Sequence, residues 1–229
     1  MNVNGHGKFI TFEGIDGCGK TTQAALLSET LKYQGYKVLQ LREPGGSAIS
    51  EKIRTLLLDP TNNCMSVRCE LLLYEAARTQ LVSEIIEPAL ASGNIVICDR
   101  FYDSTTAYQG FAGGLDIDTC IDANHLAIGN CVPDLTLVYD LDVDQAVRRI
   151  AKRSGNQALD RMEAKGLDFQ RKVAKGFETI ALEEPSRVEL VDASKSIETV
   201  ALNTIKAVEQ HLGISVSYET FVQAFKDLV

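Results

Sequence analysis

The chain has 229 residues and a formal net charge of −8, and 45% of its residues are hydrophobic and 24% charged. These proportions are typical of a globular protein with enough residues for a substantial core in one large or two small domains. The acidic balance argues against broad binding to nucleic acid or anionic membranes, although a local basic site for phosphate stays possible. We expect neither a membrane span nor an export signal, because no apolar run approaches ~20 residues and the first residues are polar.

Predicted strands and helices alternate along the chain. Apolar, β-branched runs predict strands at 8–13, 37–41, 94–99, 135–141 and 187–191. Helical spacing predicts helices at 21–33, where Gly35 ends the helix, at 67–91, where Pro88 should kink or break it, and at 167–183 and 197–212. This order predicts an α/β fold with a parallel sheet covered on both faces, and such sheets bind ligands beyond the carboxyl ends of their strands.

Two segments stand apart from this alternation. Residues 153–166 are polar and mixed in charge, and they are interpreted as a mobile excursion, or lid. Residues 214–229 have the pattern of a short amphipathic helix. We therefore predict one domain over 1–213, with a lid at about 153–166, and a C-terminal extension over 214–229.

The six cysteines, at positions 18, 64, 69, 98, 120 and 131, form no C-x-x-C pair. They favour reduced thiols in a cytosolic protein over disulfides. The three histidines do not cluster with cysteines, which argues against zinc. Cys18 lies close to a predicted helix N-terminus, where a thiol can acquire a lowered pKa, but a small side chain that fills space is the simpler interpretation.

The segment GIDGCGKT, residues 14–21, matches the phosphate-binding pattern G-x-x-x-x-G-K-[ST]. Glycines allow backbone N–H groups to approach phosphate, and the following helix adds its positive end. Lys20 is expected to reach the β- and γ-phosphates, and the Thr21 hydroxyl to ligate Mg²⁺. A strand precedes the segment and a helix follows it, so a chance glycine turn is the weaker alternative. The residues expected to bind the nucleoside triphosphate are Gly14, Ile15, Asp16, Gly17, Cys18, Gly19, Lys20, Thr21 and Thr22.

This segment alone does not choose among GTPases, motor ATPases and small-molecule kinases. We find no N/T-K-x-D run of the kind that specifies guanine, and a motor usually has a longer chain. Other charged and aromatic residues follow the second and third strands or lie on the 67–91 helix. Arg42, Arg78 and Arg100 suit bidentate phosphate contacts. Asp99 could order Mg²⁺ or an arginine, or only cap its strand.

The motifs EGIDGCGKTT, REPGG, YEAAR, DRFYDSTTAYQG and LDR occur here in that order. Together they resemble the thymidylate kinase family, over most of the chain from about residue 9 to 198. The resemblance implies a five-stranded P-loop kinase fold and the reaction of ATP and dTMP to ADP and dTDP with Mg²⁺. It also implies a homodimer formed by helix packing, and a cytoplasmic location.

The resemblance also implies a role for each matching residue. Asp16 would contact the 3′-hydroxyl of the acceptor sugar, and Tyr74 would stack on thymine, where the family often has Phe. Tyr108 would disfavour a 2′-hydroxyl, although both tyrosines could instead be plain core packing. Asp99 and Arg100 would lie near the transferred phosphoryl group. The remaining residues expected around the acceptor are Glu43, Pro44, Arg78, Thr105 and Gln109.

Some family members have an arginine inside the phosphate loop, where this chain has Gly17. The extra catalytic cation is therefore expected from the lid, and we assign it to Arg161 of the LDR motif, with Arg153 as the alternative. Arg149 or Arg153 would flank the adenine. Two other hypotheses remain at this point: a kinase for another nucleotide or a deoxynucleoside, and a nucleotide-dependent switch without kinase turnover.

Overall fold

The computed structural model describes residues 7–154 and 160–229. Its centre is a five-stranded parallel sheet in the order β2-β3-β1-β4-β5. The strands are β1 (Lys8–Glu13), β2 (Val38–Arg42), β3 (Ile95–Asp99), β4 (Leu135–Asp140) and β5 (Val188–Asp192). The five predicted strands are confirmed, and their ends differ from the prediction by no more than one residue.

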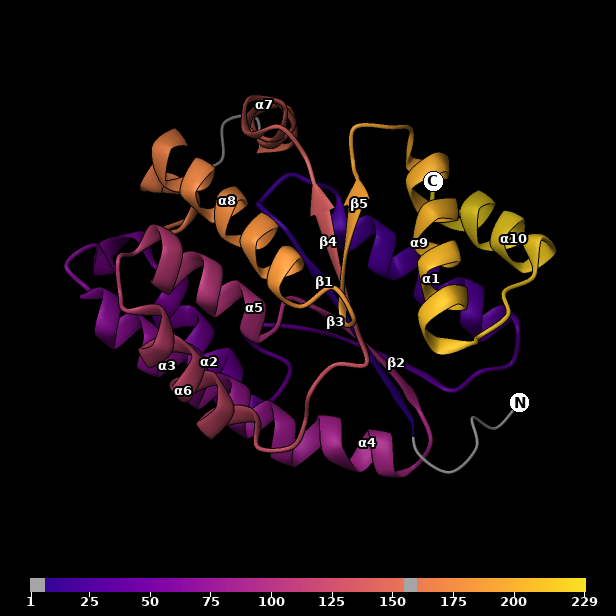
Figure 1. Cartoon of the computed structure of the whole chain (residues 1–229), viewed down its shortest axis with the longest axis horizontal. Helices are drawn as coiled ribbons and strands as arrows, with labels where there is room; N and C mark the ends of the chain where they lie inside the picture. The colour runs from indigo at the N-terminus through magenta and orange to yellow at the C-terminus, as the bar shows by residue number, and fades with distance from the viewer. Residues whose placement is uncertain (1–6, 155–159) are drawn as a thin grey trace.

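Helices cover both faces of the sheet, as predicted (Figure 1). One face carries α1 (Lys20–Tyr33), α9 (Ile197–Leu212) and α10 (Tyr218–Leu228); the other carries α3 (Val67–Leu81), α6 (Ile117–Ile128) and α8 (Leu167–Glu183). Neighbouring residues of β1 and β3 therefore enter different cores: Ile10 packs with the larger cluster, whereas Phe9 and Val96 pack with the smaller one. This explains why these strands are continuously apolar rather than alternating.

The helix predicted at 67–91 is broken earlier than Pro88. The α3 helix ends at Leu81, a single π-helical turn spans Val82–Ile86, and α4 (Glu87–Ala91) follows with Pro88 in its first turn. Proline lacks an N–H group and its ring displaces a carbonyl one turn earlier. The wider π-helical turn accommodates the missing N–H and the displaced carbonyl before Pro88. Proline is then tolerated in the first turn of α4.

Four helices of the described residues were not predicted: α2 (Ala48–Leu58), α5 (Tyr102–Thr105), α6 and α7 (Val143–Ser154). The sequence contains a signal for the start of α2, because serine is a preferred N-cap residue. In the structure the Ser47 side chain accepts a hydrogen bond from the backbone N–H of Ser50. The predicted lid overlaps the end of α7, and its residues 155–159 lie outside the described residues. The division into 1–213 and 214–229 stays a prediction, as do the bounds of the lid.

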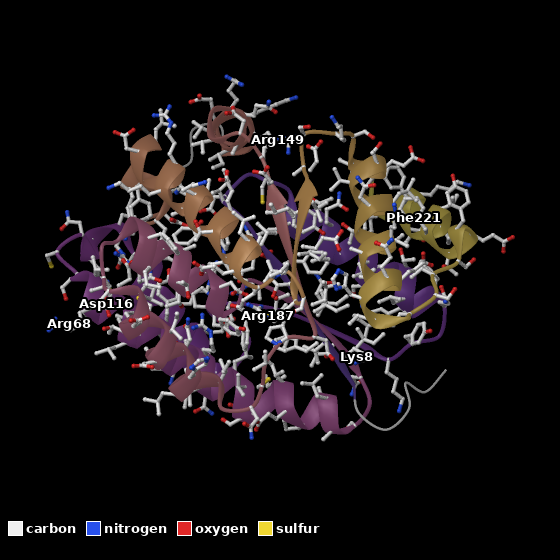
Figure 2. The ribbon with its side chains drawn as sticks, in the orientation of Figure 1. Lys8, Arg68, Asp116, Arg149, Arg187 and Phe221 are labelled. Atoms are coloured by element: carbon white, nitrogen blue, oxygen red, sulfur yellow. The ribbon has the colours of Figure 1, made fainter. Side chains whose placement is uncertain are left out.

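The predicted C-terminal helix is α10, which packs against α1. Phe221 is only 1% exposed and lies between α10 and the rest of the protein (Figure 2). The Tyr33 hydroxyl at the end of α1 also donates to Asp227, at 2.5 Å. The extension therefore braces the helix that starts at the phosphate loop.

A buried carboxylate holds the turn after β3. Glu13, the last residue of β1, accepts hydrogen bonds from the backbone N–H of Phe101 at 2.7 Å and from the Ser104 hydroxyl at 2.5 Å. Arg100, between them and β3, has φ 73° and is the one non-glycine with positive φ in the part of the chain that the structure describes. Such a backbone is strained and persists when surrounding contacts impose it. The Glu13 carboxylate and the bond from Arg100 N–H to the Phe12 carbonyl, at 2.9 Å, supply those contacts.

Phe221→Ala should lower the free energy of unfolding by about 3–5 kcal/mol, because it removes a fully buried ring between α10 and the protein core. Urea unfolding at fixed pH measures the change. Leu228→Ala, at the exposed end of the same helix, is the control and should change stability by less than about 1 kcal/mol. Equal stability of the two variants would show that α10 does not brace the fold.

Stability should fall as pH rises through the range in which Glu13 titrates. Burial, and secondarily the charge of Asp103, raises the pKa of Glu13 to about 7 from its ordinary value of 4.5. The folded protein therefore retains this proton when the unfolded chain has lost it, so stability is highest below about 4.5 and declines until about pH 7. One pKa unit corresponds to about 1.4 kcal/mol, so the contribution is about 3 kcal/mol.

Glu13→Gln cannot ionise, so its unfolding free energy should vary less with pH between 4.5 and 7. Urea titrations at several pH values compare it with the parent and with Glu198→Gln, an exposed control on α9. A Glu13→Gln curve parallel to the parent curve would contradict the assignment.

Candidate active site

The phosphate loop lies between β1 and α1, and its backbone conformation and close neighbours require glycine at three positions. Gly14, Gly17 and Gly19 have φ of 132°, 81° and 101°. A Cβ atom on Gly14 would lie 2.7 Å from the Tyr139 carbonyl oxygen, and one on Gly17 would lie 2.6 Å from that of Ala146 on α7. Larger residues are strained there whatever the space. The closeness of α7 therefore explains why this chain has no arginine at position 17.

The two expected metal ligands lie side by side at the start of α1. The Thr21 hydroxyl donates to a carboxylate oxygen of Asp99, at the end of β3, over 2.5 Å. Lys20 is only 6% exposed, and its Nζ lies 3.7 Å from Asp16 and 3.4 Å from the Ile15 carbonyl oxygen. The loop therefore brings a cation, a hydroxyl and a carboxylate to one point at the carboxyl edge of the sheet.

Arg100 connects this loop to the next strand. Its guanidinium donates to Asp16 at 2.7 Å, to the Gly14 carbonyl at 3.0 Å and to the Tyr108 hydroxyl at 3.2 Å. It also lies 5.1 Å from the centre of the Tyr108 ring, which is a cation–π arrangement. Arg100 thus joins the phosphate loop to Tyr108 in one hydrogen-bonded unit.

A cavity of ≈ 220 Å³ opens beside this unit. It brings together most of the residues that the sequence analysis assigned to the acceptor and the reacting phosphates. These lining residues are Asp16, Lys20, Thr21, Arg42, Glu43, Pro44, Tyr74, Arg78, Asp99, Arg100, Thr105, Tyr108 and Gln109. The residues that the sequence analysis did not assign are Arg54, Leu58, Phe101, Ser104, Asp160 and Met162.

Arg78 forms the floor of the cavity and is 1% exposed. Its guanidinium donates to Glu43 at 2.8 Å, to Glu75 at 2.5 Å and to the Thr105 hydroxyl at 3.0 Å. Burial acts to lower the pKa of Arg78, but the two carboxylates more than offset it and raise that pKa. Arg78 is therefore a buried cation held in a fixed orientation at the edge of the cavity.

Arg161 packs against α2 and α3 and is not among the residues that line the cavity. Its guanidinium is buried, donating from Nη1 to Glu70 at 2.5 Å and from Nε to the Leu57 carbonyl at 2.7 Å. Both contacts are on the α2–α3 side of the cavity. The expected role of Arg161 as the cation at the transferring phosphoryl group stays a prediction. The side chain of Arg153, the alternative, lies outside the described part of the chain.

Arg149 lies on α7 above the phosphate loop (Figure 2). It donates to the carbonyl oxygens of Cys18, at 3.4 Å, and Ala193, at 3.1 Å. It thereby joins the loop to the segment after β5. Its predicted place beside adenine stays a prediction, as does the assignment of Ile15, Cys18 and Thr22 to ATP.

Each of the six cysteines is free, as expected, and Cys18 is buried. Burial raises the pKa of the Cys18 thiol, and the nearby charge of Lys20 offsets this only in part. The thiol is therefore protonated at neutral pH, which supports the interpretation of Cys18 as a small packing residue.

Sequence reasoning missed the buried carboxylates Glu13, Glu70 and Glu75, which hold site residues in place. Glu70 had a readable signal, because it lies four residues before Tyr74 and eight before Arg78, on the same face of one helix. A charge on the face that enters the core is rare unless it is paired. Glu75 had a signal of the same kind, because its partner Arg78 lies three residues later on the same helix, whereas the partners of Glu13 lie 88 and 91 positions away.

Comparison with known proteins gives one consistent result. The family model described as thymidylate kinase matches residues 12–203. A thymidylate kinase of Pelobacter propionicus is 48% identical over 209 residues, covering 90% of this chain and 95% of that protein. One from Exiguobacterium sibiricum is 45% identical over 206 residues, covering 90% of this chain and 96% of that protein.

Comparison with solved structures gives the same result as comparison of sequences. The crystal structure of thymidylate kinase from Ehrlichia chaffeensis superimposes with a TM-score of 0.73 at 36% identity, covering 89% of this chain and 99% of that one. The chain belongs to the thymidylate kinase family.

Proposed function

We propose that this chain transfers the γ-phosphoryl group of ATP to dTMP, giving ADP and dTDP. The observation that carries the proposal is the continuity of the site: one cavity is lined by Lys20 and Thr21 at one end and by Arg78 and Tyr74 at the other. Transfer between two nucleotides needs both to be held in one water-poor space. A switch that binds a single nucleotide needs no such second pocket.

ATP would lie with its phosphates in the loop over 14–21, where positive-φ glycines bare the backbone N–H groups and α1 begins. Lys20, at the end of the loop, is placed to bridge the β- and γ-phosphates. Its ion pair with Asp16 is 3.7 Å long, so an incoming phosphate can compete for the ammonium group. Lys20 thus neutralises charge that builds up during transfer.

Mg²⁺ fits the same place. The hydroxyl of Thr21 and the carboxylate of Asp99 are hard oxygen donors already in contact. Across residues 7–154 and 160–229 the structure shows no cluster of three His, Cys, Asp or Glu side chains that could hold a metal. Phosphate and water oxygens would complete the shell, which is usual for Mg²⁺. When bound, the ion would neutralise charge on the phosphates that flank the breaking bond.

The acceptor would lie in the rest of the cavity. Asp16 is oriented by Arg100 and by the Tyr108 hydroxyl, and its carboxylate can accept from a sugar hydroxyl. Tyr74 offers a ring for stacking, and Arg78, whose Nη2 donates to the Phe101 carbonyl at 3.2 Å, has one further N–H on that nitrogen for the base edge. Arg100 and the loop around Glu43 and Pro44 would hold the monophosphate. Because Arg100 also contacts Asp16 and Gly14, it can align the acceptor with the phosphate loop.

Turnover of an acceptor panel tests this assignment. With ATP, dTMP should be the best acceptor, dUMP should be about tenfold weaker because it lacks one methyl group, and UMP should be roughly 100-fold weaker because Tyr108 crowds the 2′ side. ADP formation is measured for these and for dCMP, dGMP and thymidine. Lys20→Ala is the control and should lose turnover with each acceptor while retaining dTMP binding in calorimetry. Comparable turnover of UMP or dGMP would refute the proposed substrate.

We also propose that the chain forms a homodimer through α2, α3 and α6 and works in the cytoplasm, where ATP is abundant. The support for the dimer is an apolar outer face: Leu72 on α3 is 61% exposed and Leu126 on α6 is 87% exposed. These helices pack on one another and form one side of the molecule (Figure 1). None of the described helices is long and apolar enough to cross a bilayer.

Leu72→Asp should shift the protein toward monomer in sedimentation analysis, because a charge would then face the partner. Leu182→Asp is the matched control: Leu182, on α8, is 75% exposed and lies away from the proposed interface. A monomeric parent, or the same effect from both variants, would exclude this interface.

A further inference from the structure

Glu70 joins three parts of the chain at the base of the acceptor cavity. It lies on α3 and is 1% exposed. Its carboxylate accepts from Gln109 Nε2 at 2.7 Å, from Arg161 Nη1 at 2.5 Å and from Lys165 Nζ at 3.0 Å. Gln109 belongs to the π-helical turn after α5 (Tyr102–Thr105), whereas Arg161 and Lys165 belong to the segment before α8.

The two cations keep Glu70 an acceptor. Burial acts to raise the pKa of Glu70, but Lys165, the Gln109 amide and Arg161 together lower it below the ordinary value. An ionised carboxylate can only accept hydrogen bonds. The group of Gln109 that faces Glu70 must therefore be its donor, the amide NH₂.

This hydrogen bond also sets the orientation of the Gln109 amide oxygen. The residue is 1% exposed and lines the cavity. A carboxamide has one donor group and one acceptor oxygen on opposite sides of the same carbon. One N–H of the NH₂ group is committed to Glu70, and the amide oxygen, on the other side of the carbon, is the acceptor that remains for a molecule in the cavity. An oxygen there favours a ligand that donates a hydrogen bond.

We propose that Glu70, clamped by Arg161 and Lys165, is a positioning residue that turns the Gln109 amide oxygen toward the acceptor base and so selects bases with a ring N–H at that edge. The inference rests on the proposed function, because it takes the acceptor to be a nucleotide. Thymine and uracil donate from N3, whereas cytosine presents a lone pair there. Glu70 therefore contributes to the choice of base without touching it, and Arg161 acts through Glu70 rather than at the phosphates.

A purely structural role for Glu70, as an anchor for the segment that carries Arg161, makes a different prediction. Loss of an anchor would weaken all acceptors by a similar factor. Loss of an orienting group would weaken one kind of base and improve another, because a freed amide can rotate and present either its oxygen or its NH₂. The ratio between two matched acceptors separates the two roles.

The experiment compares dTMP with 5-methyl-dCMP, which differ only at N3 and at the substituent on C4. Turnover and calorimetric binding are measured for the parent, Glu70→Gln and Asp103→Asn. Asp103 is a matched control: its carboxylate is buried and pairs with Arg187 at 2.8 Å, but it does not line the cavity. Thermal unfolding checks that each variant is folded.

Glu70→Gln should reduce the preference for dTMP over 5-methyl-dCMP by about tenfold or more, and 5-methyl-dCMP should bind more tightly than it does to the parent. Asp103→Asn should lower stability and leave the ratio unchanged. An unchanged ratio in Glu70→Gln, with both acceptors weakened equally, overturns the proposal. If the parent binds both nucleotides but transfers to neither, the proposed function fails, and the binding ratio still decides the role of Glu70.

Arg161→Met gives a second test that does not depend on Glu70→Gln being folded. With one cation removed, burial should raise the pKa of Glu70, so that it protonates as pH falls and can donate to the amide oxygen. The preference for dTMP should then decrease between pH 8.5 and 6 in this variant and stay level in the parent. A pH-independent ratio in the variant, with kcat reduced equally for both acceptors, overturns the proposal and restores the transition-state role of Arg161.

Discussion

The contact between Asp16 and Arg100 is the interaction on which the site depends. Asp16 belongs to the phosphate loop and Arg100 to the turn after β3, and their side chains meet at 2.7 Å. Neither residue could hold its position alone: Arg100 has a strained backbone, and Asp16 lies in a loop built from glycines. The Glu13 carboxylate accepts from the backbone of the turn after β3, and the Arg100 guanidinium donates to the Gly14 carbonyl and the Tyr108 hydroxyl. The phosphate loop and the cavity side that carries Tyr108 are therefore held together. Phosphoryl transfer between two bound nucleotides requires such a fixed arrangement.

Buried charge is used repeatedly around this unit. Arg78 pairs with Glu43 and Glu75, Glu70 with Arg161 and Lys165, and Arg187 with Asp103. Such pairs contribute little net stability, because desolvation offsets much of the attraction, but loss of one partner leaves an uncompensated buried charge. Each pair therefore fixes geometry more than it adds stability. In the acceptor cavity this rigidity matters, because the ligand is recognised by hydrogen-bonding groups whose direction must be set before it binds.

Much of the site followed from local sequence. The phosphate loop has a fixed spacing of glycines and lysine, and its position between a strand and a helix follows from periodicity alone. Asp99 ends β3 and Arg100 follows it directly, and Tyr108 and Gln109 lie in the short helical segment that comes next, so the edge on which they lie was predictable. The contact of Arg161 with Glu70 could not be predicted, because the two residues lie 91 positions apart and a polar segment gives no indication of which buried carboxylate it will meet. Pro88 was recognised as a breaker, but the wide turn that absorbs it lies earlier in the helix.

The sequence by itself determined the five strands and their alternation with helices, the parallel sheet, the phosphate loop and the chemical types gathered at the carboxyl edge. Those features depend on residues close together in the chain, whose hydrophobic period and turn chemistry act locally. Only the tertiary structure decided which charges pair. Glu13 meets Phe101 and Ser104, Glu70 meets Gln109 and Arg161, and Gly17 is confined by Ala146. Each of these contacts joins segments that the fold brings together, and a carboxylate accepts equally well from any donor, so its partner is set by the packing of the elements and not by its neighbours in sequence.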